Sequence, residues 1–229
     1  MPLPILNMGL KTVLLAWMLA TLLYCPVHAR GPLLPQGQGA VAHNFDGDTL
    51  KLTDRRVVRL AGIDTPELGG KKDPPQYHAR ASRDLLNNLA KGKKIHLYGA
   101  GEESKDRYGR ITAEVLLDDG RSLNEIMVRE GAAFVYPHKG QDPELLERLL
   151  SLQRQAIQQR KGMWEHLLSL PVAHQTYLGN RNSQRFFPAD CTEAQRIKPR
   201  NRVYFGTLMD AFLLGYAPAR VCPFWPTEK

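Results

Sequence analysis

Residues 46–67 read DGDTLKLTDRRVVRLAGIDTPE, and this stretch decides the fold that we expect for the rest of the chain. Leucine and valine alternate with polar residues in two short segments, which is the pattern of strands with one buried face. We therefore expect strands at 48–53 and 56–61. An Asp-Gly turn dipeptide precedes the first of them, so a third strand at 40–45 is expected to enter through a hairpin.

Three acidic residues lie at the ends of these predicted strands. Asp48 lies at the start of the first strand, and Asp64 and Glu67 follow the second in an extended segment. Gathered carboxylates repel one another, and a divalent cation with oxygen ligands or a neighbouring arginine relieves the repulsion. Arg59 alternates with Leu60 and should lie on the opposite face of its strand. Taken singly, each acid is an ordinary solvated turn residue, which is the alternative interpretation.

Three motifs carry a family resemblance. They are DGDT at 46–49, RLAGIDTPE at 59–67 and KDRYGR at 105–110, and in this order they resemble the staphylococcal (micrococcal) nuclease family, the thermonucleases. The resemblance covers residues 41–164. It implies an α+β, mainly β fold: a five-stranded OB-fold barrel with about three helices, followed here by a small C-terminal appendage.

The other elements of the expected barrel follow from local patterns. Apolar residues four apart predict helices, alternation predicts strands, and Ser, Asp and Pro mark helix starts. A tryptophan after the last helix, Trp164, is expected in the core. The expected elements are a helix at 77–91 with Ala81, Leu85, Leu86 and Leu89 on its apolar face, strands at 94–98 and 111–117, a short helix capped by Ser122, and a long helix opened by Asp142 and Pro143.

The resemblance also implies which residues form the active site. A calcium ion would be held by Asp48, Asp64 and the backbone carbonyl of Thr65, with Asp46 supporting them from behind. The residues expected to act on the scissile phosphate and the attacking water are Arg59, Arg110 and Glu67, with Glu67 as the candidate base. The residues expected to contact the nucleotide are Arg107, Tyr108 and Tyr136, and for Tyr136 a place in the core is the alternative.

The implied function is calcium-dependent, non-specific hydrolysis of phosphodiester bonds in DNA and RNA, leaving 3′-phosphate ends. The alternative is an OB-fold module that binds nucleic acid or protein without cutting, which would predict loss of one or more of the acids or arginines. The formal charge of +8 favours a polyanionic partner such as nucleic acid.

The N-terminal residues predict export. A lysine, an apolar run and a Val-His-Ala sequence make residues 1–29 a candidate signal peptide, followed by a Pro- and Gly-rich linker at 30–39. A retained membrane anchor is the alternative. We expect a periplasmic or secreted monomer with no stable membrane association after cleavage, with a nuclease-like domain at 40–168 and a small module at 174–229.

The tail contains two cysteines, Cys191 and Cys222. It loosely resembles a small cysteine-rich metal-binding module, but the final Cys-x-x-Cys is incomplete because Ala219 stands at its first position. Removal of residues 1–29 would take away the third cysteine, Cys25, and leave these two. In an exported chain an even number of cysteines favours a disulfide, and a remnant metal site is the alternative. A basic run at 196–202 is expected either to widen the nucleic-acid contact or to be structural only.

Overall fold

The computed structural model describes residues 34–70, 73–99, 105–138 and 140–228. The predicted signal peptide at 1–29 lies outside these residues. Among the helices that are described, none is long and apolar enough to cross a membrane.

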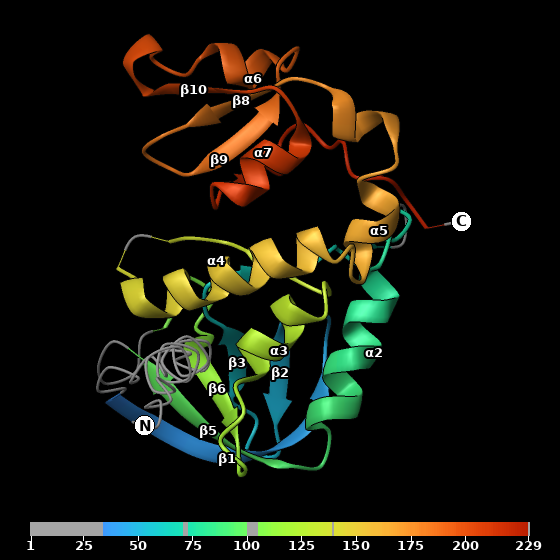
Figure 1. The fold of residues 1–229 in the computed structure, drawn as a ribbon. Helices are drawn as coiled ribbons and strands as arrows, with labels where there is room; N and C mark the ends of the chain where they lie inside the picture. The colour runs from blue at the N-terminus through green and yellow to red at the C-terminus, as the bar shows by residue number, and fades with distance from the viewer. Residues whose placement is uncertain (1–33, 71–72, 100–104, 139, 229) are drawn as a thin grey trace, which may run out of the picture. The chain divides into compact units, whose positions relative to one another are not determined.

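Five strands close into a barrel (Figure 1). The order around the barrel is β1-β2-β3-β6-β5, and every neighbouring pair is antiparallel except β3 and β6, which are parallel. This is the topology of a five-stranded OB-fold, so the predicted fold class is confirmed. The strands are β1 (Leu34–Asn44), β2 (Thr49–Leu52), β3 (Val57–Leu60), β5 (Lys94–Gly99) and β6 (Ile111–Leu117).

Strand β1 begins earlier than the sequence predicts. Residues 34–39 are strand rather than linker, and they pair with β5 from Leu34 opposite Gly99 to Ala40 opposite Lys94. Pro and Gly residues are typical of a linker, but here they lie in a strand, and Gly39 packs closely against β2. A Cβ atom at Gly39 would lie 2.8 Å from Cδ1 of Leu52, so a larger residue there would require the buried Leu52 side chain to move.

Helices pack against the outside of the barrel. Three of them pack on the strands, because Leu86 of α2, Met127 of α3 and Leu149 of α4 belong to the same buried cluster as the strand residues. The buried residues of α5 belong to a second cluster, which includes residues of the tail. Two N-caps are as predicted, because the side chains of Ser122 and Asp142 accept the first backbone N–H groups of α3 and α4. The helices are α2 (Ala79–Ala90), α3 (Leu123–Arg129), α4 (Pro143–Gln158) and α5 (Met163–Leu167).

Helix α2 packs on the core through most of the predicted face. Leu86 is fully buried, and Leu85 and Leu89 pack against the same cluster, as predicted. The prediction for Ala81 is wrong, because this residue is exposed and Ser82 is buried instead. The Ser82 hydroxyl donates to the Ala132 carbonyl at 2.6 Å, which satisfies a polar side chain in the core and is not revealed by apolar spacing.

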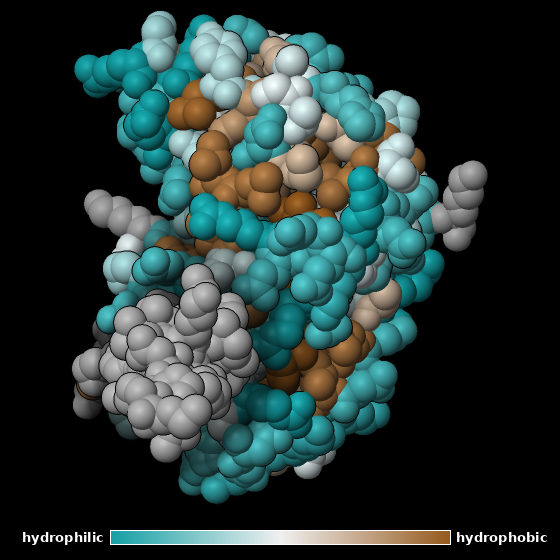
Figure 2. All heavy atoms as spheres, viewed as in Figure 1, coloured by the Kyte–Doolittle hydropathy of each residue, from teal (hydrophilic) through white to brown (hydrophobic). Residues whose placement is uncertain are grey.

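The tail forms a second sheet of four strands in the order β10-β8-β9-β11. The Sγ atoms of Cys191 and Cys222 are bonded at 2.04 Å, which confirms the predicted disulfide. Figure 2 shows hydrophobic residues gathered over α7, where Met209 and Leu214 are exposed. The elements are η1 (Pro171–His174), β8 (Tyr177–Asn180), β9 (Arg185–Pro188), α6 (Thr192–Gln195), η2 (Pro199–Asn201), β10 (Arg202–Phe205), α7 (Leu208–Leu213) and β11 (Ala217–Pro218).

An aromatic cluster joins the tail to the rest of the chain. Phe134 lies in β7 (Phe134–Val135), which pairs with β4 (Ile63–Asp64), and its ring is 5.7 Å from that of Phe212 and 5.5 Å from that of Trp225. Trp164 is fully buried against Phe212 at 4.8 Å, which confirms its predicted place in the core. The segment that carries Asp64 is therefore held next to the tail.

Candidate functional site

The turn between β1 and β2 buries one carboxylate at the mouth of the barrel. Asp48 is 4 % exposed, and its backbone N–H donates to Oδ1 of Asp46 at 3.0 Å. A Cβ atom at Gly47 would lie 2.8 Å from the side chains of Ser82 and Thr65, so the turn requires glycine there. Asp46 thus holds the backbone that carries Asp48.

Arg59 joins the two buried acids. Its Nη2 lies 3.0 Å from Oδ2 of Asp48 and 2.7 Å from Oδ1 of Asp64, while its Nη1 donates to the Leu60 carbonyl at 2.9 Å. The Arg59 side chain is only 11 % exposed. Alternation along β3 places Leu60 in the core and Arg59 on the other face, as the sequence predicts.

Two threonine hydroxyl groups donate hydrogen bonds to the Asp48 carboxylate. Thr49 donates to its Oδ1 at 2.9 Å, and Thr65 donates to its Oδ2 at 3.2 Å. Both oxygens of Asp48 are therefore bonded while they remain close to Asp64.

Burial makes these carboxylates weaker acids than usual. It raises the pKa of Asp48 to about 6, although Arg59 opposes the shift, and it also raises the pKa of Asp64. Burial disfavours the charge of Arg59 too, but the two neighbouring carboxylates outweigh it and raise the pKa of Arg59. For both carboxylates, the effect of burial on the pKa therefore outweighs the opposing attraction of Arg59.

Glu67 lies at the edge of this cluster. Its side chain is 48 % exposed, and its backbone N–H donates to Oε1 of Gln76 at 2.8 Å. Partial burial raises the pKa of Glu67, and a nearby arginine, Arg220, opposes the shift. A carboxylate with a raised pKa that solvent can reach is suited to accept a proton from water.

Arg110 approaches the site from β6. Its Nε donates to Oδ2 of Asp106 at 2.7 Å, and its Nη1 lies 3.5 Å from Oγ1 of Thr49. Because β6 pairs in parallel with β3, Arg110 and Arg59 arrive at the same end of the barrel. Two guanidinium groups thus flank the Asp48 turn.

Tyr108 is an exposed aromatic residue between arginines. It is 68 % exposed, and the guanidinium carbons of Arg107 and Arg110 lie 4.8 and 5.3 Å from the centre of its ring. An exposed ring flanked by cations fits stacking on a nucleobase beside a phosphate.

Tyr136 is placed differently. It is half-buried, the guanidinium carbon of Arg185 lies 3.6 Å from its ring centre, and the His138 ring lies 4.7 Å away. A residue of the tail therefore covers one face of this ring, and a base would have to use another.

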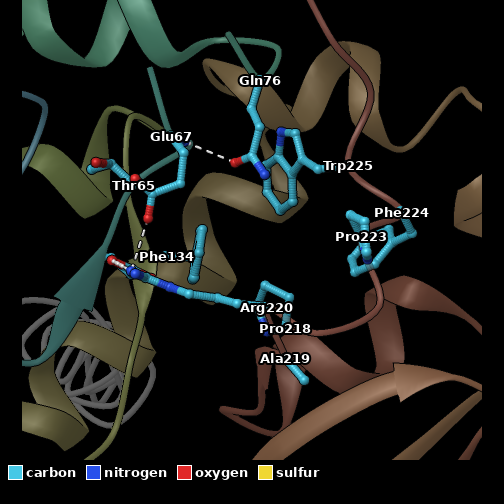
Figure 3. A pocket seen from close by; sticks show the side chains of 11 residues that line it. Thr65, Glu67, Gln76, Phe134, Pro218, Ala219, Arg220, Pro223, Phe224 and Trp225 are labelled. Carbon is cyan, nitrogen blue, oxygen red and sulfur yellow. Dashed lines mark hydrogen bonds and ion pairs between the residues drawn. The ribbon is translucent and has the colours of Figure 1, made fainter. Parts of the chain in front are cut away.

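Arg220, which sequence reasoning missed, also enters the site. Its Nη2 lies 3.0 Å from Oδ2 of Asp64 and 2.9 Å from Oε1 of Glu67 (Figure 3). It is separated from Asp64 by 156 residues, so no local pattern connects them. The only available signal is its position two residues before Cys222.

The donor chemistry of the site fits a hard divalent cation. Asp48 and Asp64 share one guanidinium nitrogen, so their oxygens converge, and both carboxylates are buried. In the part of the chain that is described, no three His, Cys, Asp or Glu side chains form a complete metal site. A cation would therefore take further oxygen ligands from a backbone carbonyl, water and substrate phosphate, as calcium readily does.

The metal-binding alternative for the tail is not supported. Both sulfur atoms of Cys191 and Cys222 are used in the disulfide, and the described residues contain no other cluster of metal ligands there.

Comparison with known proteins identifies the family. The family model for staphylococcal nuclease homologues matches residues 57–166. An uncharacterized endonuclease from Escherichia coli is 38 % identical over 136 residues, which cover 58 % of this chain and 80 % of that protein. The micrococcal nuclease of Shigella flexneri is 31 % identical over 56 % of this chain and 73 % of its own length, and the thermonuclease of Staphylococcus hyicus is 32 % identical over 53 % and 72 %. Together with the barrel topology, these matches show that the chain belongs to the staphylococcal nuclease family of phosphodiester-hydrolysing enzymes.

Proposed function

We propose that this nuclease is calcium-dependent, acts on DNA and RNA without sequence specificity, and leaves 3′-phosphate ends. The observation that carries the proposal is the pair of buried carboxylates, Asp48 and Asp64, joined by Arg59 at the barrel mouth. Every residue that the family resemblance requires is present, and the structure gathers the principal ones at one end of the barrel.

Two arginines are assigned to the scissile phosphate. Hydrolysis adds negative charge to the phosphoryl oxygens, and preorganised cationic donors stabilise that charge. Guanidinium groups offer paired donors that match two phosphate oxygens, which a lysine does not provide. Arg59 is fixed by its carboxylate partners and Arg110 by Asp106, so both are oriented before substrate arrives.

Glu67 is assigned to the attacking water. Its raised pKa favours proton uptake, and its half-exposed side chain leaves room for a water molecule. A proton passes from water to the Glu67 carboxylate as the water oxygen bonds to phosphorus. The bond from phosphorus to the 5′ oxygen breaks, and the departing 5′ oxygen takes up a proton from solvent to become a hydroxyl group. Because this is the bond that breaks, the phosphate stays on the 3′ side.

The calcium ligands would be Asp48, Asp64 and the carbonyl of Thr65, with Asp46 supporting the turn. When bound, the ion would supply positive charge beside the phosphate and help to place water. The protein itself buries the carboxylates of Asp48 and Asp64 and holds them close together despite their mutual repulsion.

The lack of sequence specificity rests on Tyr108. Its exposed ring can stack on any base because every base has a π face. Arg107 and Arg110, which lie beside this ring, would bind the phosphates of the nucleic acid, and every nucleic-acid sequence has these phosphates.

We also propose that the protein is exported and monomeric. The Cys191–Cys222 disulfide is typical of an oxidising compartment, which agrees with the signal peptide expected at 1–29.

The first test is hydrolysis of single-stranded DNA by the protein, with calcium and then with a chelator. Wild-type protein should cleave only with calcium, and Glu67→Gln and Arg59→Ala should each lose about 10²-fold or more in kcat. Arg121→Ala, which removes an exposed arginine paired with Asp119, is the matched control and should keep full activity. Binding without cleavage at every calcium concentration would support a non-catalytic binding module instead.

A further inference from the structure

Arg220 brings a third guanidinium group to the acidic side of the site. It comes from the tail, which lies outside the matched family region at 57–166. One nitrogen, Nη2, contacts both Asp64 and Glu67 at 2.9–3.1 Å. Arg220 therefore pairs with Glu67 and also with Asp64, which it shares with Arg59.

Most of the Arg220 donor capacity is still available. A guanidinium has five N–H donors, and within the described part of the chain Nη1 and Nε of Arg220 have no hydrogen-bond partner. Its side chain is 63 % exposed, compared with 11 % for Arg59 and 29 % for Arg110. Of these three arginines, Arg220 can bind an incoming anion with the least rearrangement.

A pocket of about 300 Å³ adjoins Arg220. Figure 3 shows Gln76, Phe134 and Trp225 around it, with the Arg220 side chain running along one side towards Glu67. Aromatic rings, prolines and one side-chain amide line the pocket away from the acids, and Asp64, Thr65 and Glu67 line the side where Arg220 binds the two carboxylates. The apolar rings and the amide suit a flat heterocycle with polar edges. Its volume lies at the lower end of the range for small-ligand sites.

We propose that the C-terminal segment 218–225 forms a nucleotide subsite, in which Arg220 binds a substrate phosphate next to the scissile one and the adjoining pocket receives the attached nucleoside. This inference rests on the proposed nuclease function and assigns part of substrate binding to the tail. Nη2 stays on the carboxylates, while Nη1 and Nε bind the phosphate.

The fold holds Arg220 in place before substrate binds. On one side, β11 pairs with β9 and the N–H of Ala219 donates to the Phe186 carbonyl at 2.8 Å. On the other side, Cys222 is tied to Cys191. A segment fixed at both ends loses little conformational entropy on binding, so its contacts contribute fully to affinity.

A competing explanation uses the same contacts. Arg220 would then occupy the carboxylates in place of the cation, and its removal would tighten calcium binding without weakening nucleic-acid binding. Measurements of nucleic-acid binding and of calcium binding by the same variant separate this arrangement from the subsite.

The test is binding of a fluorescent single-stranded oligonucleotide to the full chain in chelator, over a range of salt concentrations. Arg220→Met should weaken binding about tenfold at low salt, and the slope of log K against log salt should become shallower by about 0.7, the value for one phosphate contact on a single strand. Arg220→Lys, which keeps the charge, should retain most of the slope. The matched control is Arg121→Met, an exposed, ion-paired arginine beyond the opposite end of β6, which spans roughly 23 Å.

A second arm tests the phosphate directly. A single neutral methylphosphonate is moved along the oligonucleotide, and at one position it should weaken binding to wild type but not to Arg220→Met. An abasic nucleotide at the adjoining position should weaken wild-type binding several-fold if the pocket receives a base.

Two outcomes would overturn the subsite. One is equal slopes for Arg220→Met and Arg121→Met. The other is unchanged binding together with tighter calcium binding by Arg220→Met, measured by calorimetry. Because no binding measurement depends on cleavage, failure of the subsite is distinguishable from failure of the proposed calcium-dependent hydrolysis, which wild-type cleavage assays test in parallel.

Discussion

The carboxylate of Asp48 lies where its own charge is disfavoured. It is 4 % exposed and has Asp46 and Asp64 as acidic neighbours, and burial raises its pKa to about 6. The folded protein therefore binds a proton at Asp48 more tightly than the unfolded chain does, for which the ordinary value is 3.8. Stability is lost as the pH rises from about 4 to about 6, and the ionised form is destabilising above that window.

Replacement of Asp48 by Asn should therefore stabilise the protein in chelator at pH 7. The shift of about two pKa units sets the scale at about 1–3 kcal/mol, and the gain should disappear near pH 4, where Asp48 is protonated. Chemical unfolding at both pH values measures this difference. Calcium should stabilise the wild type and have little effect on the variant.

The control is Asp54→Asn. Asp54 is exposed, and hydrogen bonds from Arg56 lower its pKa, so the pH dependence of this variant should have the opposite sign. Destabilisation by Asp48→Asn in chelator at pH 7 would contradict the argument and show that the ion pair with Arg59 outweighs the burial of charge.

Arg110 offers a cleaner test of phosphate stabilisation than Arg59, because Arg59 also holds two buried acids together. Arg110→Ala should lower kcat by 10²–10³-fold, equivalent to about 2.7–4 kcal/mol of transition-state stabilisation. Arg110→Lys should recover only part of the loss, because it lacks the paired donors. Steady-state kinetics on single-stranded DNA gives both values, with the melting temperature as the check on folding. A loss confined to KM would assign Arg110 to ground-state binding only.

At the scale of elements, Gln153 of α4 connects the barrel to the tail. It is fully buried, its Oε1 accepts from the N–H of Val135 in β7 at 2.7 Å, and its Nε2 donates to the carbonyl of Phe212 in α7 at 2.6 Å. One side chain thus satisfies buried backbone groups in two elements that are far apart in sequence.

Gln153→Met keeps the side-chain length but removes the acceptor of the Val135 N–H and one of two bonds to the Phe212 carbonyl, which also accepts from the Gly215 N–H at 3.0 Å. One buried group is then unsatisfied, which costs about 1–3 kcal/mol, so we expect a loss of about 1–3 kcal/mol in the free energy of unfolding. Gln155→Met, at an exposed position of the same helix, should change stability by less than about 0.5 kcal/mol. Urea titration of both variants makes the comparison, and equal midpoints would show that water replaces the lost bonds.

Local patterns explain which elements the sequence could predict. The strands around Leu50 and Leu60 alternate cleanly, and the caps at Ser122 and Asp142 are formed within three residues, so all were predictable. Residues 34–39 were not, because their strand conformation depends on pairing with β5, about 60 residues away. The buried position of Ser82 depends in the same way on the distant Ala132 carbonyl.

In the candidate site too, residues within one local motif could be predicted, and residues brought in by distant contacts could not. Asp48, Arg59, Asp64 and Glu67 lie within one continuous motif, so their convergence could be predicted from the sequence alone. Arg220 has no motif of its own, and only tertiary folding brings it to Asp64.

At the scale of the whole molecule, residues 32–229 form one compact unit. Phe134 and Trp164 from the barrel region share a buried cluster with Phe186 and Phe212 from the tail. The division into a domain at 40–168 and a module at 174–229 stays a prediction. If either the barrel region or the tail unfolded, the residues of this cluster in the other part would become exposed to water. We therefore expect the barrel region and the tail to unfold together.

The disulfide tests this cooperativity. Closing a loop with a sequence separation of 31 stabilises a fold by ~3–4 kcal/mol in the chain-entropy model, so Cys191→Ser/Cys222→Ser should lower the free energy of unfolding by that amount. If the unit is cooperative, tryptophan fluorescence and far-ultraviolet circular dichroism should shift to the same lower midpoint, in a single transition. Added reductant is the control, because it should lower the wild-type midpoint and leave that of the double variant unchanged. An early transition of the tail, with the barrel still unfolding at the wild-type midpoint, would instead show two independent domains.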